Sequence, residues 1–222
     1  MIEICSMHVL VIAATESEIA PFIAQNKVAE YLITGVGVPA CLYQLVKKIQ
    51  LNKYDAVIQA GIAGSFNPGI LLGETVLVQK DIFADLGIFE KDELKNLFDV
   101  GLAEKNETPY KDGWLINENK FLQQSTLKKT TAITINTVGD DKKIINQYVR
   151  KYHADIESME GAAFHYGCLQ EKIPFIQLRS ISNKVGERDK LKWKMNEAIT
   201  QLNIELGKLF AEVSNQQSVV NS

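Results

Sequence analysis

The chain alternates short apolar segments with helical segments, and this alternation constrains its fold more than any other feature. His8 to Ala13 is short and rich in branched aliphatic residues, which is typical of a buried strand. A helical stretch then runs to about Gln25, and Thr15 and Glu18 have the spacing of a capping box at its start. Strands that alternate with helices are typical of α/β proteins. We therefore predict an α/β fold, a three-layer α/β/α sandwich around a central mixed, largely parallel sheet.

The same alternation continues along the chain. Further strands are expected at residues 31–34, 55–60, 74–79, 131–137, 156–160 and 175–181. Further helices are expected at residues 39–51, 161–171 and 191–213. The stretch 81–129 lacks this regularity and predicts loops, a short helix and an insertion over one face. No linker or repeat divides the chain, so we expect a single domain over residues 1–213, followed by a polar tail, residues 214–222.

Composition and charge exclude several classes of protein. With 46% hydrophobic and 23% charged residues, the 222-residue chain has the balance of a folded soluble protein. Its net charge is −3 and it has no basic cluster, which argues against a nucleic-acid partner. The early apolar run Val9 to Ala14 is far shorter than the roughly 20 residues of a membrane span. Met1 to His8 lacks the basic residues of a signal peptide. These features predict a cytoplasmic protein with no membrane partner.

The three cysteines also indicate a cytoplasmic protein. Cys5, Cys41 and Cys168 are widely spaced, odd in number and surrounded by apolar residues, and no CxxC pair occurs. A structural zinc site is therefore not expected. We interpret the cysteines as buried thiols in a reducing compartment. No metal and no cofactor is predicted.

Two segments that follow predicted strands are candidates for a ligand-binding site, one because of its glycines and the other because of its carboxylate. Gly61-Ile62-Ala63-Gly64 reads as a turn after a strand, where glycines would let a ligand approach the backbone. It lacks the spacing of a phosphate-binding loop, and a simple tight turn explains it equally well. Ser158-Met159-Glu160-Gly161 places a carboxylate after a strand, where ligands of open α/β sheets bind. The two oxygens of the Glu160 carboxylate would match the spacing of two neighbouring hydroxyl groups. The ordinary alternative is a carboxylate that lies at the start of a helix only because the helix dipole stabilises it there.

Two more segments carry polar groups at strand ends. Glu16 and Glu18 follow the first strand, where the helix dipole alone would explain them. The last predicted strand ends in Arg179-Ser180-Ile181-Ser182-Asn183-Lys184, which a surface loop rich in turn-forming residues would also explain. Each segment is weak alone, whereas their order along the chain is informative.

In that order the chain resembles the nucleoside phosphorylase and nucleosidase superfamily, which includes the methylthioadenosine/adenosylhomocysteine nucleosidases. The resemblance extends from Val9 to about Leu209. Its most specific segments are Ala14-Thr15-Glu16-Ser17-Glu18, Thr34-Gly35-Val36-Gly37, Gly61-Ile62-Ala63-Gly64, Ser158-Met159-Glu160-Gly161-Ala162 and Arg179-Ser180-Ile181-Ser182-Asn183. The stretch Ile156 to Lys190 is most similar to the futalosine hydrolases, which release hypoxanthine from a nucleoside intermediate of an alternative menaquinone pathway.

The resemblance implies a role for each candidate residue in cleaving an N-glycosidic bond. Glu160 would hold the ribose hydroxyls and stabilise a cationic sugar, and Glu18 would be the general base for the attacking water. The other implied substrate contacts are Gly61, Ile62, Ala63, Ser158, Met159 and Ser182. Some relatives carry a serine at the position of Ile62, so the water site would differ here.

Asn183 is the informative departure from the family. Adenine-specific relatives hold an aspartate there, which donates to N7 and accepts from the adenine amino group. A 6-oxopurine has acceptors at both N7 and O6, and an amide can donate to them. A mispaired buried polar group costs about 1–3 kcal/mol, so Asn183 predicts hypoxanthine or guanine as the base. An amide cannot be a general acid, and the sequence leaves open whether N7 is protonated through a solvent relay or the base leaves as a hydrogen-bonded anion.

Several alternatives and partners remain to be tested. Phosphorylases of the superfamily hold phosphate with arginines, whereas this chain has none before Arg150, so water is the expected nucleophile. The alternatives are a methylthioadenosine/adenosylhomocysteine nucleosidase, a purine nucleoside phosphorylase and a nucleoside-binding module without turnover. Lys184 and Arg188 are candidates for a substrate carboxylate, or simply solvated charges. Relatives are usually dimers or larger, so we expect a homodimer or larger homo-oligomer. Candidate contacts, which an ordinary covering layer would also explain, are Phe83, Leu86, Ile88 and Phe89.

Overall fold

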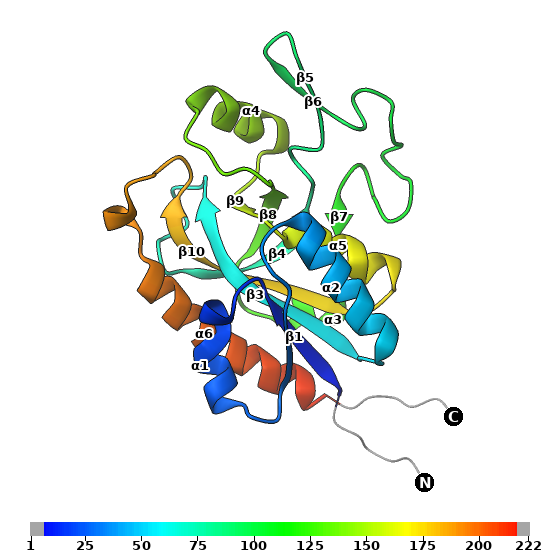
Figure 1. Ribbon diagram of the computed structural model, residues 1–222, viewed down its shortest axis with the longest axis vertical. Helices are drawn as coiled ribbons and strands as arrows, with labels where there is room; N and C mark the ends of the chain where they lie inside the picture. The colour runs from blue at the N-terminus through cyan, green and yellow to red at the C-terminus, as the bar shows by residue number, and fades with distance from the viewer. Residues whose placement is uncertain (1–6, 217–222) are drawn as a thin grey trace.

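The computed structural model describes residues 7–216 and shows an α/β fold (Figure 1). The strands are β1 (Val9–Ala13), β2 (Glu30–Ile33), β3 (Ala56–Ser65), β4 (Thr75–Asp81), β5 (Gly87–Glu90), β6 (Glu93–Asn96), β7 (Leu115–Ile116), β8 (Lys129–Thr134), β9 (Ile156–Ser158) and β10 (Phe175–Lys184). The helices are α1 (Glu16–Gln25), α2 (Val38–Leu51), α3 (Lys120–Gln124), α4 (Lys142–Tyr152), α5 (Gly161–Gln170) and α6 (Met195–Ser214), with a 3₁₀ turn at Lys190–Lys192.

The central sheet is mixed and largely parallel, as predicted. Its strand order is β10-β4-β8-β9-β3-β1-β2, and β7 pairs with β4. The β10–β4, β3–β9 and β4–β7 pairs are antiparallel, whereas the other pairs in this sheet are parallel. Because β10 also pairs with β3, the strands β10, β4, β8, β9 and β3 close into a ring. The long strands β3 and β10 lie side by side in that ring.

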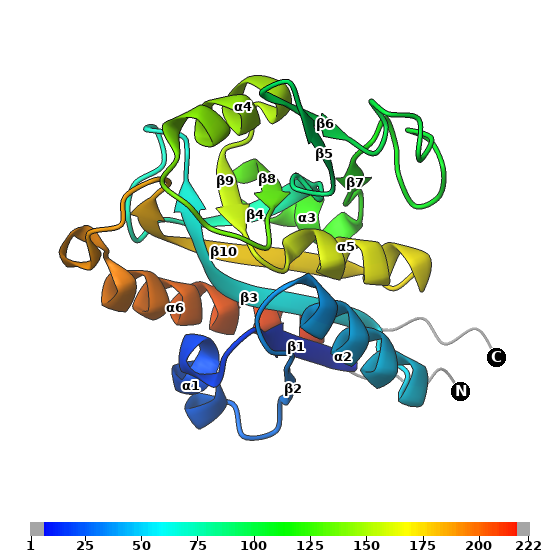
Figure 2. The same cartoon turned by 45° about the horizontal axis from the view of Figure 1, so that its top comes forward.

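Helices cover both faces of the sheet (Figure 2). Alternation along β1 shows how the sequence produces this arrangement. Val9 and Val11 pack into a core with α1 and α6, whereas Leu10 and Ile12 pack into a second core with α2 and α5. A strand that is apolar on both faces must be covered on both, and the predicted three-layer arrangement is confirmed.

The segment predicted to be a turn, Gly61-Ile62-Ala63-Gly64, lies inside β3 instead. The prediction was wrong because β3 continues past Ala60 with partners on both sides. Gly61 pairs with Arg179 of β10, and Gly64 pairs with Asn183 of β10 and with Glu157 of β9. Neither glycine has a positive φ, so their role is to leave room for neighbouring side chains.

Other boundaries also differ from the prediction. Helix α4 was not predicted at all, although Asp141 caps it by accepting a hydrogen bond from the Lys143 N–H (2.7 Å). Helix α6 begins at Met195 and not at the predicted residue 191. Asp189 accepts a hydrogen bond from the Leu191 N–H (3.0 Å) and starts a 3₁₀ turn at Lys190–Lys192 instead. The predicted tail begins inside α6, since Ser214 is helical, and residues 217–222 lie outside the described residues.

The stretch 81–129 contains a β5–β6 hairpin at one end of the molecule, followed by loops, β7 and α3 (Figure 1). The candidate contacts Leu86, Ile88 and Phe89 are 46%, 42% and 58% exposed, whereas Phe83 packs partly against the core. Cys41 and Cys168 are buried free thiols, and Cys5 lies outside the described residues. Within residues 7–216, no helix is long and apolar enough to span a membrane.

Candidate active site

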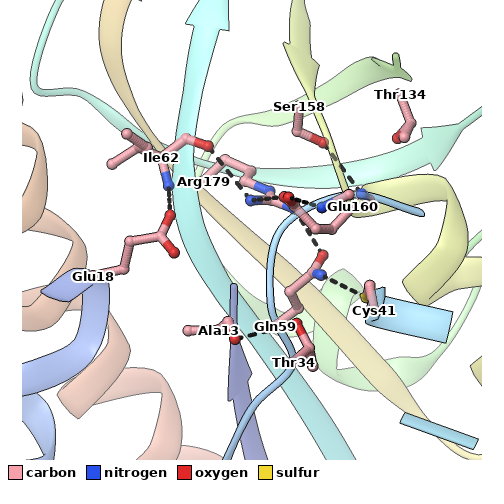
Figure 3. A network of polar contacts seen from close by, with 12 residues as sticks. Ala13, Glu18, Thr34, Cys41, Gln59, Ile62, Thr134, Ser158, Glu160 and Arg179 are labelled. Atoms are coloured by element: carbon pink, nitrogen blue, oxygen red, sulfur yellow. Dashed lines mark hydrogen bonds and ion pairs between the residues drawn. The ribbon is translucent and has the colours of Figure 1, made fainter. Parts of the chain in front are cut away.

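Glu18 lies in the first turn of α1 and is fixed against β3. Its Oε1 accepts a hydrogen bond from the Ile62 N–H (3.0 Å), which Figure 3 shows. Its Oε2 accepts from the N–H and the hydroxyl of Thr15 (3.0 and 3.1 Å). The capping box predicted from the sequence is therefore also the device that orients this carboxylate. Glu18 is buried but remains an acceptor at a defined position beside the strand.

Glu160 lies between β9 and α5 and faces the same part of β3 from the other side (Figure 3). Its Oε1 accepts a hydrogen bond from the Gly37 N–H (2.9 Å). Gly37 has φ +91°, a conformation that glycine adopts at little cost. Burial raises the pKa of Glu160, and the nearby Arg179 charge and the Gly37 N–H oppose that shift. The negative charge of Glu18 raises the pKa of Glu160 further, because a second nearby negative charge makes the Glu160 carboxylate less favourable.

Arg179 lies beside Glu160, and no role was predicted for it from the sequence. Its Nη1 lies 3.8 Å from Glu160 Oε2, and its Nη2 donates to Gln59 Oε1 (2.9 Å). The Nη1 group also donates to the Ile62 carbonyl (3.4 Å). Arg179 is almost completely buried. The available signal was one charged residue inside an apolar strand, since such residues are rarely buried without partners.

Gly61 makes room for this arrangement. A Cβ atom on Gly61 would lie 2.3 Å from Arg179 Nη1 and 3.0 Å from Glu18 Oε1. The first distance is shorter than any normal contact, so a side chain there would displace the guanidinium group. The sequence predicted that glycine lets a ligand approach the backbone at this point, and the groups that approach Gly61 in the structure are the protein's own Arg179 and Glu18 side chains.

Asn183 lies near the end of β10, beside Gly64. Its Oδ1 accepts a hydrogen bond from the Ser182 hydroxyl (2.8 Å), and its Nδ2 donates to the Lys184 carbonyl (3.0 Å). The Nδ2 atom is 3.4 Å from the position that a Cβ on Gly64 would take. Ser182 is buried, and its hydroxyl also lies 3.3 Å from the Ala63 carbonyl, so it orients the amide.

The remaining predicted contacts lie in the same region. Ile62 and Met159 are partly buried, and Ala63 is buried within β3. The Ser158 hydroxyl accepts a hydrogen bond from the Gly161 N–H (3.2 Å) and so serves the start of α5.

The two cations suggested for a substrate carboxylate behave differently. Lys184 Nζ donates to the carbonyls of Asn67 (3.1 Å) and Ile70 (2.8 Å), so its charge is already engaged by the backbone. Arg188 is exposed, and its guanidinium carbon lies 5.9 Å from the centre of the Trp193 ring.

The structure thus brings the three predicted catalytic side chains to one stretch of β3. Glu18 and Glu160 flank Gly61 and Ile62, and Asn183 lies beside Gly64. Three residues of strand span about 10 Å, a length comparable with that of a purine nucleoside. Two carboxylates and an amide spaced in this way can accept a proton from water, stabilise a cationic sugar and donate to a base. Within residues 7–216, no group of three or more His, Cys, Asp or Glu residues is placed to hold a metal ion.

Comparison with known proteins identifies the family and the fold of this chain. A family model described as the phosphorylase superfamily matches residues 25–212. The futalosine hydrolase of Thermus thermophilus is 31% identical over 185 residues, 82% of this chain and 81% of the relative. A 5'-methylthioadenosine/S-adenosylhomocysteine nucleosidase of Tolumonas auensis is 25% identical over 71% of this chain and 70% of its own. The nucleosidase of Colwellia psychrerythraea, solved in complex with adenine, has a TM-score of 0.76 at 18% identity and covers 99% of both chains.

The chain therefore belongs to the phosphorylase superfamily. Within that superfamily it is a nucleosidase, an N-glycosidic hydrolase of the group that contains the futalosine hydrolases and the methylthioadenosine/adenosylhomocysteine nucleosidases.

Proposed function

We propose that this nucleosidase hydrolyses the N-glycosidic bond of futalosine, releasing hypoxanthine and dehypoxanthine futalosine for menaquinone biosynthesis. The observation that carries the proposal is the amide of Asn183, held beside Gly64 at the end of the site. An amide can donate to N7 or O6 of hypoxanthine, whereas adenine presents a donor at its 6-position. The futalosine hydrolase of Thermus thermophilus matches over 81% of its own length at 31% identity, whereas a 5'-methylthioadenosine nucleosidase of Arabidopsis thaliana with the same identity matches over 53% of its own length. The more complete match supports the same substrate.

Glu18 and Glu160 have different roles in the proposed cleavage. Glu18 is the general base: its oxygens are oriented by the Ile62 N–H and by Thr15, and a water between Glu18 and the sugar would lose its proton to it. Glu160 accepts the ribose hydroxyls through Oε2, since Oε1 accepts from the Gly37 N–H and the Arg179 guanidinium stays 3.8 Å from Oε2. As positive charge develops on the ribose, the buried carboxylate stabilises it.

The arginines favour water over phosphate as the nucleophile. Arg179 is buried and engaged by Gln59, the Ile62 carbonyl and Glu160. Arg150 is exposed on α4, and Arg188 follows the end of β10. A phosphate beside Glu18 would meet a carboxylate and no unengaged guanidinium in the described part of the site. Hydrolysis is therefore the reaction that this arrangement supports.

Product analysis with and without phosphate tests the proposal. The protein is incubated with futalosine, inosine and methylthioadenosine, and the released base is identified by chromatography. Hypoxanthine released from futalosine without phosphate is the expected result. Adenine from methylthioadenosine as the main product would favour the second candidate, the nucleosidase activity of the 25% identical relatives. Dependence on phosphate would indicate a phosphorylase, and no release from any substrate would indicate a binding module.

Two further expectations belong to this proposal. We expect a homodimer or larger homo-oligomer, with the exposed Leu86, Ile88 and Phe89 as candidate contacts. We expect the reaction to take place in the cytoplasm, where the buried thiols of Cys41 and Cys168 would stay reduced.

A further inference from the structure

A small cavity lies beside the Asn183 end of the site, and one buried acid faces it. The cavity has a volume of about 240 Å³. Its lining residues are Asp85, Ile135, Thr137, Gly139, Asp141, Ile144, Ile145, Tyr148 and Glu157. Sites for drug-sized ligands are typically about 300–1,000 Å³, so this volume suits a single ring system. Its apolar walls come mainly from α4 and the end of β8.

Glu157 connects this cavity with the predicted base site. It pairs with Gly64, whose other neighbour in the sheet is Asn183. Glu157 Cγ and Asn183 Nδ2 lie 3.3 and 3.4 Å from the position of a Cβ on Gly64. Since glycine has no side chain, Glu157, Asn183 and Val185, whose Cγ2 lies 3.1 Å from the same point, all pack around this position in the middle strand.

The Glu157 carboxyl has no ordinary structural task. Its residue is only 5% exposed, yet neither carboxyl oxygen receives a hydrogen bond from any group within residues 7–216. The Glu157 oxygens are not among the fully enclosed side-chain atoms that lack a partner, so they are accessible from the cavity that the residue lines. Neither Glu18 nor Glu160 is placed to serve the base, because Glu18 is held by the Ile62 N–H and Glu160 by the Gly37 N–H beside Arg179.

We propose that Glu157 is the proton donor to the purine leaving group, the role that the amide of Asn183 cannot fill. This inference rests on the nucleosidase function proposed above. Asn183 would hold the base by donating to O6, and the Glu157 carboxyl would donate its proton to N7. The cavity beside Glu157 would receive the ring.

The surroundings of Glu157 let a substantial fraction of it stay protonated near neutral pH. Burial raises its pKa to about 7, and the positive charge of Arg188 opposes the shift. Of the other groups lining the cavity, Asp85 accepts from the Asn136 N–H (2.6 Å) and Asp141 from the Lys143 N–H (2.7 Å). Burial and the charges of Asp85 and Glu157 raise the pKa of Tyr148 to about 12, so this phenol stays neutral.

The proposed step is balanced in protons and electrons. The bond between C1′ and N9 breaks, and its electron pair passes into the purine, whose N7 takes the proton from Glu157. Water adds to C1′ and loses a proton to Glu18. Glu157 is left ionised and Glu18 protonated, and one proton exchanged by each with solvent restores both.

The test compares the wild-type protein with Glu157→Gln, which keeps the shape but cannot supply a proton. Substrates are futalosine and inosine, which need a protonated leaving group, and 4-nitrophenyl riboside, whose phenolate leaves unaided. We expect kcat on both nucleosides to fall about 100-fold or more in the variant, with the 4-nitrophenyl rate within about threefold of wild type. The wild-type rate on inosine falls above pH 7, and this limb is absent in the variant. Glu187→Gln, an acid engaged by Lys192, is the matched control.

The outcomes separate this inference from the function on which it rests. If the wild-type protein releases no hypoxanthine from either nucleoside, the proposed function itself fails. If it does and Glu157→Gln is unchanged, or loses activity equally on all three substrates, the role of Glu157 is wrong. A thermal unfolding scan of each variant shows whether an equal loss reflects damage to the fold.

Discussion

Arg179 and Glu160 form a buried ion pair that is not a direct hydrogen bond. The Nη1 to Oε2 distance is 3.8 Å, and the two side chains are 2% and 6% exposed. The guanidinium is held instead by Gln59 and by the Ile62 carbonyl. The pair therefore supplies a compensating charge without a direct hydrogen bond to Oε2, the oxygen that we propose binds the ribose hydroxyls.

Removing the cation should destabilise the protein. Arg179→Met leaves Glu160 as a buried charge without its counter-ion, which typically costs about 3–5 kcal/mol. We expect a loss of that size in the free energy of unfolding in urea, together with loss of activity. Arg150→Met, on the exposed face of α4, is the control and should change stability by less than about 0.5 kcal/mol. A loss below about 1 kcal/mol for Arg179→Met would show that the pair is unimportant for stability.

The side chains packed against Gly61 give a second prediction. Gly61→Ala places a methyl group 2.3 Å from Arg179 Nη1 and 3.0 Å from Glu18 Oε1. We expect a stability loss of about 1–3 kcal/mol and an activity loss of at least about tenfold, because the methyl group displaces Arg179 and crowds Glu18, the proposed general base. The control is Gly207→Ala in α6, where no atom lies within 4 Å of the new methyl group. That change should stabilise the helix by up to about 1 kcal/mol. Equal behaviour of the two variants would contradict the role given to Gly61.

The amide at position 183 should set the preference for the base. Asn183→Asp can offer a protonated carboxyl to N7 and accept from the adenine amino group. We expect the kcat/KM ratio of inosine to methylthioadenosine to fall about 10- to 100-fold, the effect of one mispaired buried group. Asn52→Asp, at the exposed end of α2, is the matched control. An unchanged ratio in Asn183→Asp would mean that another residue reads the base.

Stability at low pH should depend on His165. Burial lowers the pKa of this imidazole to about 4 from its ordinary 6.5, so the folded state keeps it neutral. The unfolded chain takes up a proton as the pH falls below 6.5, and stability is lost progressively down to about pH 4. The loss amounts to about 3 kcal/mol and should be absent in His165→Gln.

Asp81 acts in the opposite direction over part of this range, because burial raises its pKa to about 6 from 3.8. Its carboxyl contributes stability at low pH that is lost as the pH rises through 6. Both proteins in the comparison keep Asp81, so the difference between their urea midpoints at pH 4.5 and 7.5 isolates His165. His153→Asn, at the exposed end of α4, is the control. A parallel acid response in wild type and His165→Gln would contradict the prediction.

The sequence predicts elements whose burial follows from local pattern. Strand β1 is apolar at every position, and the capping box at Thr15 marks the start of α1, so both were predictable. The segment Gly61–Gly64 was not predictable as strand, because glycines locally favour turns and the pairing that extends β3 comes from β9 and β10. Helix α4 went unrecognised because charged residues surround its few apolar positions.

The residues of the candidate site divide in the same way, into those that a local sequence pattern marks and those that only long-range packing reveals. Glu18, Glu160 and Asn183 could be proposed as site residues from the sequence because they stand in ordered motifs at the ends of strands. Arg179 and Glu157 were not given roles, because a charged residue in a strand shows neither its burial nor its partner in the sequence. Both depend on long-range packing: Arg179 on Gln59 and the Ile62 carbonyl, and Glu157 on the cavity wall formed by α4.

The central claim is that this nucleosidase acts on a hypoxanthine nucleoside and uses water. A competition assay tests it most directly: futalosine and methylthioadenosine are mixed at equal concentration without phosphate, and the initial rates of hypoxanthine and adenine release are measured. The account predicts that hypoxanthine is released at least about tenfold faster than adenine. Adenine released at the same rate or faster would contradict it.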